Sequence, residues 1–337
     1  MALTIPKRQN RMPDVVPYEE ALKRTEDSER TLLIGNGFSI KYFSYGSLLA
    51  AAGLKEDDPA LALFKALDTV DFERVVHALE HAAVVAHAYK NDKHSEQLVA
   101  DADRIRQALV KAVRDTHPGH REDIADVIPS CIDFLKDFAT VFTFNYDLLL
   151  YWVILDKDCP FSDGFGLGTE ENGFRGPFHP EANCNVYNLH GGLHLFQTSV
   201  GDVEKRLMGE NGVIDAIART ITQDKRLPIY VAEGTSTAKL ARINSIPYLR
   251  HCHDQLGESS GNFFVYGHSA DPNDAHVYDA LFNSEIEHLY FCLHKPTAKI
   301  EEIDGELARY KKRNDSDIDY TFVDAETAHI WDRPPKK

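Results

Sequence analysis

Four short apolar runs in this chain each end in a motif of small and polar residues. The motifs are GNGFS at 35–39, TFNYD at 143–147, NLHG at 188–191 and GHS at 267–269. Short apolar runs bounded by turn residues indicate buried strands. The carboxyl ends of parallel strands meet at one edge of an open sheet, where ligands bind. The pattern therefore predicts one site built from four strand ends, with a histidine in it.

The alternation of strand-like and helix-like segments predicts an α/β protein. We expect a Rossmann-like, mostly parallel sheet with helices on both faces. Strands are expected at 31–34, 139–143, 185–189, 227–232, 262–266, 288–293 and 320–323. Helices are expected at 148–155, 238–257 (broken at Pro247), 273–282 and 298–312.

The predicted organisation is a lead-in followed by one domain. Residues 1–30 form the lead-in, with a short helix at 18–24, and residues 31–337 form a single α/β domain. A helical insertion at about 59–135 follows the first strand, because apolar residues from Phe72 onward recur at i, i+3, i+4 and i+7. The glycine-rich segment 163–176 is expected to be a surface loop that is able to act as a lid.

Three residues are assigned to helix boundaries in the insertion. Asp71 and Ser95 are expected to be the N-caps of its first two long helices, since their side-chain oxygens accept backbone N–H groups. Pro129 is expected to interrupt a helix at 122–135, because proline lacks the N–H that a helix interior needs.

Composition limits the partners and the location. The chain has 337 residues and a net charge of -16, which argues against a basic surface for nucleic acid or an anionic membrane. Its five cysteines contain no CxxC pair, which favours a reducing, cytoplasmic compartment. No apolar run approaches the roughly 18 residues that span a bilayer. An anionic ligand would need locally placed donors.

The first motif has the composition of a phosphate-binding turn. Gly35 and Gly37 would let the backbone approach a phosphate, and Ser39 could cap a following helix or donate to the phosphate. The third glycine of the dinucleotide fingerprint would fall at position 40, where the chain has Ile40. A simple strand-to-helix turn is therefore an equal alternative.

The second motif carries an amide and a carboxylate. Asp147 is placed to cap the helix at 148–155, which is its favoured role. Asn145 both donates and accepts hydrogen bonds, so its side chain can hold a ribose hydroxyl or a water molecule. Turn formation is the competing interpretation for Asn145.

His190 is the candidate general base, because the unperturbed pKa of histidine lies near neutrality. The alternative is a core histidine bonded to the backbone, which is the favoured interpretation of His194. A metal site formed by the two is disfavoured, because Gly191 and Gly192 oppose a regular helix between them. We expect no metal ligands in this chain.

The last motif offers small residues that could admit a ribose or a phosphate. Asp271 and Asp274 follow it, and helix capping is the favoured role of Asp274. The segment 233–236, EGTS, either adds a carboxylate to the site or caps the next helix.

In this order, GNGFS, TFNYD, NLHG and GHS resemble the motifs of the sirtuin-like NAD-binding family, over about residues 30–295. The resemblance implies that the first motif lines the NAD phosphates and that Gly267 and Ser269 contact the adenosine half, with His268 between them. It implies that Asn145 positions the ribose or the attacking water and that His190 is the general base. Asp147 would lie near the nicotinamide or be structural. The implied binding residues are Gly35, Asn36, Gly37, Phe38, Ser39, Asp147, Gly267, His268 and Ser269.

This chain lacks the two CxxC pairs that form the zinc module of deacylating sirtuins. The resemblance is therefore closer to a prokaryotic branch, several members of which hydrolyse NAD in defence against phage. It implies an NAD glycohydrolase that uses NAD as substrate without a metal and is gated by homo-oligomerisation or a protein partner. The alternatives are an NAD or ADP-ribose sensor without turnover and, less favoured, a deacylase or ADP-ribosyltransferase.

Overall fold

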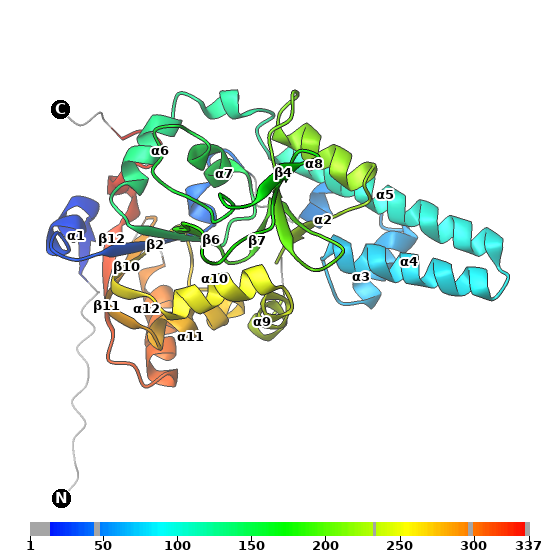
Figure 1. The fold of residues 1–337 in the computed structure, drawn as a ribbon. Coiled ribbons are helices and arrows are strands. Elements are labelled where there is room, and N and C mark those ends of the chain that lie inside the picture. Colours follow the sequence, from blue (N-terminus) through cyan, green and yellow to red (C-terminus); the bar gives the residue numbers. More distant parts are fainter. Residues whose placement is uncertain (1–13, 44–47, 232–233, 296–298, 334–337) are drawn as a thin grey trace, which may run out of the picture.

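The computed structural model describes residues 14–43, 48–231, 234–295 and 299–333 (Figure 1). Its main sheet has seven strands, and every pair of neighbouring strands is parallel. The prediction of an α/β fold with a mostly parallel sheet is therefore confirmed. In spatial order the strands are β1 (Val15–Pro17), β12 (Asp319–Asp324), β11 (Glu285–Leu293), β10 (Ser260–Tyr266), β2 (Arg30–Ile34), β3 (Thr140–Thr143) and β6 (Val186–Asn188).

The strand order reverses direction between β2 and β10. From β2 the chain builds outward through β3 to β6, then returns to the other side of β2 and builds outward through β10, β11 and β12. The two loops that leave β2 and β10 therefore run to opposite faces and open a crevice between them. Such a topological switch point is the usual ligand site in an open α/β sheet.

Alternating side chains of the strands feed two hydrophobic cores, one on each face of the sheet. Leu32 and Phe264 belong to one core, and Leu33 and Phe263 belong to the other. The first core packs against α1 (Tyr18–Arg24), α6 (Ile128–Leu135) and α7 (Leu149–Ile154). The second packs against α9 (Ser236–Ser245), α10 (Pro247–Gly257), α11 (Ala275–Phe282) and α12 (Ile300–Arg313). Both faces are covered, as predicted.

The helical insertion is present and includes a projecting arm. Its elements are α2 (Leu48–Ala51), α3 (Pro59–Ala66), α4 (Phe72–Ala88), α5 (Asp92–Thr116), the 3-10 helix η2 (Arg121–Ile124) and α6. The long helices α4 and α5 pair with each other and extend away from the sheet (Figure 1). We call this helical pair the arm.

The boundary residues of the insertion agree with prediction only in part. Asp71 caps α4 by accepting the N–H groups of Glu73 and Arg74. Ser95 is not a cap, since α5 begins three residues earlier and Ser95 donates its hydroxyl to the carbonyl of Ala83. Pro129 does not interrupt a helix. It lies in the first turn of α6, where no N–H is required of it.

A second, antiparallel sheet was not predicted. Its strands in spatial order are β4 (Thr169–Glu171), β5 (Phe174–Gly176), β8 (Val203–Arg206), β7 (Gly191–Gln197) and β9 (Pro228–Tyr230), with α8 (Val213–Thr222) between β8 and β9. The strand predicted at 227–232 therefore pairs antiparallel with β7 and not with the main sheet. The predicted loop at 163–176 contains the β4–β5 hairpin, and its Phe165 is fully buried.

The second sheet begins at a local turn in the backbone. Gly191 has a φ of +74°, so the chain turns directly out of β6 into β7 instead of starting a crossover helix. The alternation of strands and helices does not reveal this turn.

The remaining predicted elements are confirmed, including the break between α9 and α10 at Pro247. Short 3-10 helices follow β2, β10 and β12 in the chain. They are η1 (Asn36–Phe38), η3 (Pro272–Asp274) and η4 (Ala325–Ala328). Strand β1 was missed, and it adds residues 15–17 of the predicted lead-in to the main sheet beside β12. Among the described residues, no helix is long and apolar enough to cross a membrane.

Candidate functional site

The sheet register brings the four sequence motifs to one level. Ile34 of β2 is aligned with Thr143 of β3 on one side and with Tyr266 of β10 on the other. Thr143 is in turn aligned with Asn188 of β6. Two residues beyond these aligned positions, the four motifs present Asn36, Asn145, His190 and His268. The predicted meeting of four strand ends is therefore present.

The ring of Phe144 connects three of these strand ends. Its centroid lies 4.9 Å from that of His190 and 4.4 Å from that of His268. Phe144 is itself buried, and its ring contacts both imidazoles. Asn145 is the residue that follows Phe144 in the chain.

The glycines of the first and last motifs pack the two turns against each other. Gly37 donates its N–H to the carbonyl of Gly267 at 2.8 Å. A Cβ on Gly37 would lie 2.6 Å from the Cα of Gly267, and Gly267 has a φ of +74°. Only glycine fits this contact. Close packing of the turns accounts for these residues whether or not a phosphate binds there.

A hollow of about 700 Å³ opens over these turns at the β2–β10 switch point. Of the predicted binding residues, Asn36, Gly37 and 267–269 line it. Its other polar lining residues are Lys239, Asp271, Asn273, Asp274, His294, Lys295 and Lys299. Three lysines in a chain of net charge -16 make this wall suited to an anionic ligand.

Other predicted binding residues lie outside the hollow's lining. Phe38 is buried against Trp331, with ring centroids 4.9 Å apart. Ser39 is fully buried beside Asn145. The carboxylate of Asp147 accepts the N–H of Leu149 at 2.7 Å. Asp147 is not the N-cap predicted for this helix, because α7 begins at Leu149 and Leu148 occupies the N-cap position.

Asn145 presents an acceptor without a partner. Its side-chain N–H group donates to Ser39 Oγ at 3.0 Å, and its backbone N–H donates to Thr143 Oγ1 at 2.9 Å. Its Oδ1 is buried and has no hydrogen-bond partner among the described residues. A buried polar atom without a partner costs about 1–3 kcal/mol, so it needs an explanation. A bound hydroxyl or water would supply the missing hydrogen.

His190 is buried, with 4% of its surface exposed, and has charged neighbours. Its Nε2 lies 3.3 Å from Nε2 of His276 and 3.8 Å from Oδ1 of Asp274. Burial holds the pKa of His190 well below its usual value, although the Asp274 charge opposes the shift. His190 is therefore neutral at pH 7. Because its Nε2 faces His276 and Asp274, Nδ1 is the nitrogen left to accept a proton.

Asp274 was predicted to be a helix cap, and this prediction is wrong. It precedes α11 but makes no side-chain capping bond. Its Oδ1 lies 2.7 Å from Lys239 Nζ, and its Oδ2 lies 3.2 Å from His268 Nε2. Burial alone would raise the pKa of this carboxyl, but the hydrogen bond from His268 and the charge of Lys239 lower it overall. Asp274 is an ionised carboxylate in the centre of the site.

His276 is a site residue that the sequence analysis missed. Its backbone N–H donates to Ser236 Oγ at 2.8 Å, and its Nδ1 lies 3.1 Å from the same oxygen. Burial lowers the pKa of His276 to about 4. The spacing of Asp274 and His276 in DPNDAH was the available signal, since both residues flank the start of one helix.

Two further residues that the sequence analysis considered, Thr235 and His194, have structural roles. The hydroxyl of Thr235 accepts the N–H of Ala238 and caps α9, while Glu233 lies outside the described residues. His194 stacks on Tyr151 with centroids 4.4 Å apart, on β7 of the second sheet. Its predicted burial in the core is confirmed, but its Nδ1 has no hydrogen-bond partner among the described residues.

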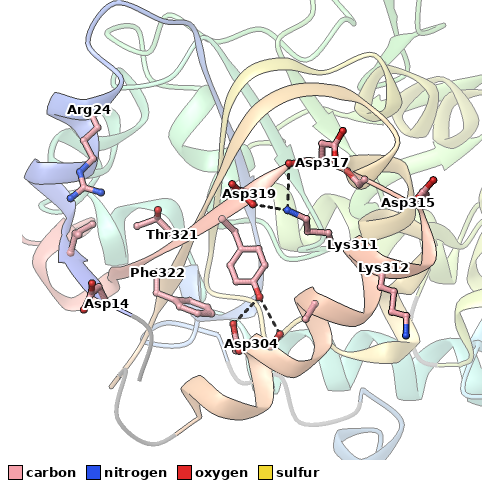
Figure 2. Close-up of a pocket in the computed structure, with 14 residues that line it drawn as sticks. Asp14, Arg24, Asp304, Lys311, Lys312, Asp315, Asp317, Asp319, Thr321 and Phe322 are labelled. Carbon is pink, nitrogen blue, oxygen red and sulfur yellow. Dashed lines mark hydrogen bonds and ion pairs between the residues drawn. The ribbon is translucent and has the colours of Figure 1, made fainter. Parts of the chain in front are cut away.

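Another hollow, of about 850 Å³, lies beside β12 and α12, away from the turns that follow β2 and β10 (Figure 2). Some of its polar groups bind one another. Lys311 pairs with Asp319, and Tyr320 donates its hydroxyl to Asp304. None of the four motifs reaches it, so the β2–β10 crevice is the better candidate site.

Fold and site together define a doubly wound α/β protein with a polar, histidine-containing crevice at its topological switch point. The chain belongs to the family described as domain of unknown function DUF4917, which matches residues 32–331. No curated protein matches the sequence.

Among solved structures, the chain is similar to a Sir2 homologue mutant in complex with ADP-ribose. The two share 13% identity with a TM-score of 0.34, over 88% of this chain and 97% of the other. A Sir2 homologue–NAD complex gives 13% identity, a TM-score of 0.36 and coverage of 89% and 97%. Because these scores are low, the fold class here rests on the strand order and not on the likeness.

Proposed function

We propose that this protein is an NAD glycohydrolase that cleaves the bond between nicotinamide and ribose. The observation that carries the proposal is the buried Oδ1 of Asn145, which has no partner among the described residues. Asn145 and His190 each lie two residues beyond the aligned pair Thr143 and Asn188. An acceptor and a neutral imidazole at one strand-end site suit the activation of water beside a ribose. The order of the four motifs, which resembles that of sirtuin-like proteins, supports the same substrate.

In the proposed complex, the adenosine half of NAD occupies the 700 Å³ hollow. The backbone of Gly37 and Gly267 forms its floor. Lys239, which pairs with Asp274 in this structure, would turn to contact the pyrophosphate. The nicotinamide ribose would then lie at Asn145, toward His190. This arrangement follows the sheet from β10 across β2 to β3 and β6.

The reaction needs one proton acceptor. As the bond from ribose C1′ to nicotinamide breaks, positive charge develops on the ribose and neutral nicotinamide leaves with the bonding electrons. Asn145 Oδ1 holds the attacking water, whose oxygen bonds to C1′. The water proton passes to His190 Nδ1, and the Asp274 carboxylate, 3.8 Å from Nε2, stabilises the imidazolium. The products are nicotinamide, ADP-ribose and a proton.

The test is nicotinamide release from NAD by the purified protein. Asn145→Ala and His190→Ala should each lower the rate about 10²–10⁴-fold, the usual range for a positioned acid–base group. His194→Gln is the matched control, because His194 is equally buried but lies on the second sheet. Equal rates for parent and both site variants would overturn the assignment.

Binding measured alongside turnover separates this function from its alternatives. Calorimetric binding of NAD without any product would favour a sensor. Product that appears only with an acylated peptide or an acceptor protein would favour a deacylase or an ADP-ribosyltransferase.

We further propose that the activity serves defence against phage and is gated by assembly. Uncontrolled cleavage would exhaust the cell's NAD, so the enzyme must be restrained until it is needed. The resemblance to prokaryotic sirtuin-like proteins supports this context, and the arm offers an assembly surface. Expression in bacteria under phage challenge, with and without His190→Ala, tests it. Protection that does not depend on His190 would contradict the proposal.

A further inference from the structure

We propose that His190, His276 and Asp274 form a binding site for a divalent transition metal of the Zn²⁺ type, and that filling it switches off His190 as a base. The second half rests on the proposed function, while the binding site itself does not. The sequence analysis expected no metal ligands, because it considered only His190 with His194, which Gly191 and Gly192 prevent from sharing a regular helix. The three residues proposed here come from two segments far apart in the chain.

The spacing of the ligand atoms fits a metal ion. His190 Nε2 lies 3.3 Å from His276 Nε2 and 3.8 Å from Asp274 Oδ1, and all three ligand atoms lie within 4.8 Å of one another. A tetrahedral Zn²⁺ with bonds of about 2.0–2.2 Å places neighbouring ligands roughly 3.4 Å apart. A small inward movement of the carboxylate would complete three corners of the tetrahedron.

The ligand types also suit such a metal. Two imidazole nitrogens and one carboxylate oxygen are common ligands of Zn²⁺, and all three residues are buried. Ser236 Oγ, 3.1 Å from His276 Nδ1, can accept the proton of that nitrogen and so direct Nε2 toward the ion. Metal-bound histidines in proteins usually have such a partner.

Lys239 is the competitor for this site. Its ammonium lies 2.7 Å from Asp274 Oδ1, and it also lines the hollow. A metal on Asp274 would repel this charge, so Lys239 must turn toward the hollow, where an anionic ligand could receive it. The lysine therefore weakens metal binding, and its removal should strengthen it.

A metal on Nε2 changes what His190 can do. A neutral imidazole has one proton on its two nitrogens, so metal binding at Nε2 leaves the proton on Nδ1. Nδ1 then cannot accept a proton from water. Metal occupancy and general-base function exclude each other at this residue.

Zn²⁺ titration of the protein without NAD tests the site, with a chromogenic chelator as competitor at pH 7.5. We expect one tight equivalent, weakened at least 10-fold by His276→Ala and by Asp274→Asn. Lys239→Met should tighten it about 10-fold. His194→Gln, which removes an equally buried histidine outside the site, should change nothing. Co²⁺ in place of Zn²⁺ should give the visible absorption of a tetrahedral site with histidine ligands, and His276→Ala should remove it.

No stoichiometric Zn²⁺, or affinity unchanged in all three site variants, would overturn the site. Circular dichroism of each variant shows whether lost binding reflects lost folding, and the gain expected for Lys239→Met cannot come from misfolding. Zn²⁺ that binds as predicted but leaves NAD cleavage unaffected would overturn the switch alone. A metal-free protein that never cleaves NAD would overturn the proposed function and leave the binding result unchanged.

Discussion

At the scale of single residues, the candidate site contains one buried acceptor without a hydrogen-bond partner and one carboxylate with several charged or polar neighbours. Asn145 Oδ1 has no partner among the described residues, whereas Asp274 is contacted by Lys239 and His268 and lies near His190. The unsatisfied atom is where a ligand gains most. The crowded carboxylate lies 3.8 Å from His190 Nε2, and in the proposed mechanism it stabilises the protonated imidazole.

The buried neutral histidines predict a pH dependence of stability. Burial lowers the pKa of His194 to about 3, against an ordinary value near 6.5. Below pH 6.5 the histidine therefore takes up a proton in the unfolded chain but not in the folded chain. The free energy of unfolding decreases as the pH is lowered. Each such histidine contributes up to about 1.4 kcal/mol per pH unit.

Urea unfolding at pH 7.0, 6.0, 5.0 and 4.5 measures this slope. The parent should lose stability steadily below pH 6.5, and His194→Gln should show a slope shallower by up to about 1.4 kcal/mol per pH unit. Identical slopes in the two proteins would show that His194 titrates normally in the folded state.

At the scale of elements, the contact between two turns fixes the crevice. The turn after β2 and the turn after β10 touch at Gly37 and Gly267, without room for a side chain between them. Because each turn also carries residues that line the hollow, their separation determines its shape. The glycines thus act through packing of the elements, in addition to any contact with a ligand.

Substitution of Gly267 should therefore cost more than its backbone conformation alone. Gly267→Ala places a methyl group 2.7 Å from Phe38 N at a φ of +74°, so we expect a loss of about 2–4 kcal/mol of unfolding free energy. Gly53 has a similar φ of +68° with nothing within 4 Å of its Cβ position. Gly53→Ala should cost only about 1–2 kcal/mol. Equal losses in urea unfolding would contradict the packing argument.

The sequence predicted the strand ends well and their connections less well. GNGFS, TFNYD, NLHG and GHS each follow a buried strand, and local patterning is enough to find such strands. The second sheet was missed because β4, β5 and β9 are only three residues long and their pairing is set by the turn at Gly191. Patterning found the strand at β9 but not its antiparallel partner, which depends on that turn.

The site itself was predicted in part, for a physical reason. Asn145 and His190 lie at strand ends, so the sequence could align them. Asp274 and His276 reach the site from the start of α11, where capping is the usual role of an aspartate. Their contact with His190 depends on tertiary packing over 80 residues apart, which one sequence does not contain.

At the scale of the molecule, the arm is the feature that the sheet does not explain. α4 and α5 extend beyond the main sheet (Figure 1) and expose apolar side chains near their far end. Val84 is 70% exposed, Val85 56%, Tyr89 83% and Val99 49%. Clustered apolar exposure on a projecting hairpin is typical of an interaction surface.

We expect the arm to mediate self-association. Light scattering during size-exclusion chromatography should show an oligomer that Val84→Glu with Tyr89→Glu converts to monomer, because two charges oppose burial of the patch. Val200, 81% exposed on a loop of the second sheet, is the matched control, and Val200→Glu should leave the oligomer intact. A parent protein that is monomeric at every concentration would leave gating to a protein partner and overturn self-association.

The most direct test of the account is a crystal structure of the His190→Ala variant with NAD, since the slowed variant should retain the intact substrate. The account predicts adenosine in the 700 Å³ hollow, the pyrophosphate near Gly37 and Gly267, and the nicotinamide ribose within hydrogen-bond distance of Asn145 Oδ1. NAD bound beside β12, or in the hollow with its nicotinamide ribose pointing away from Asn145, would contradict it.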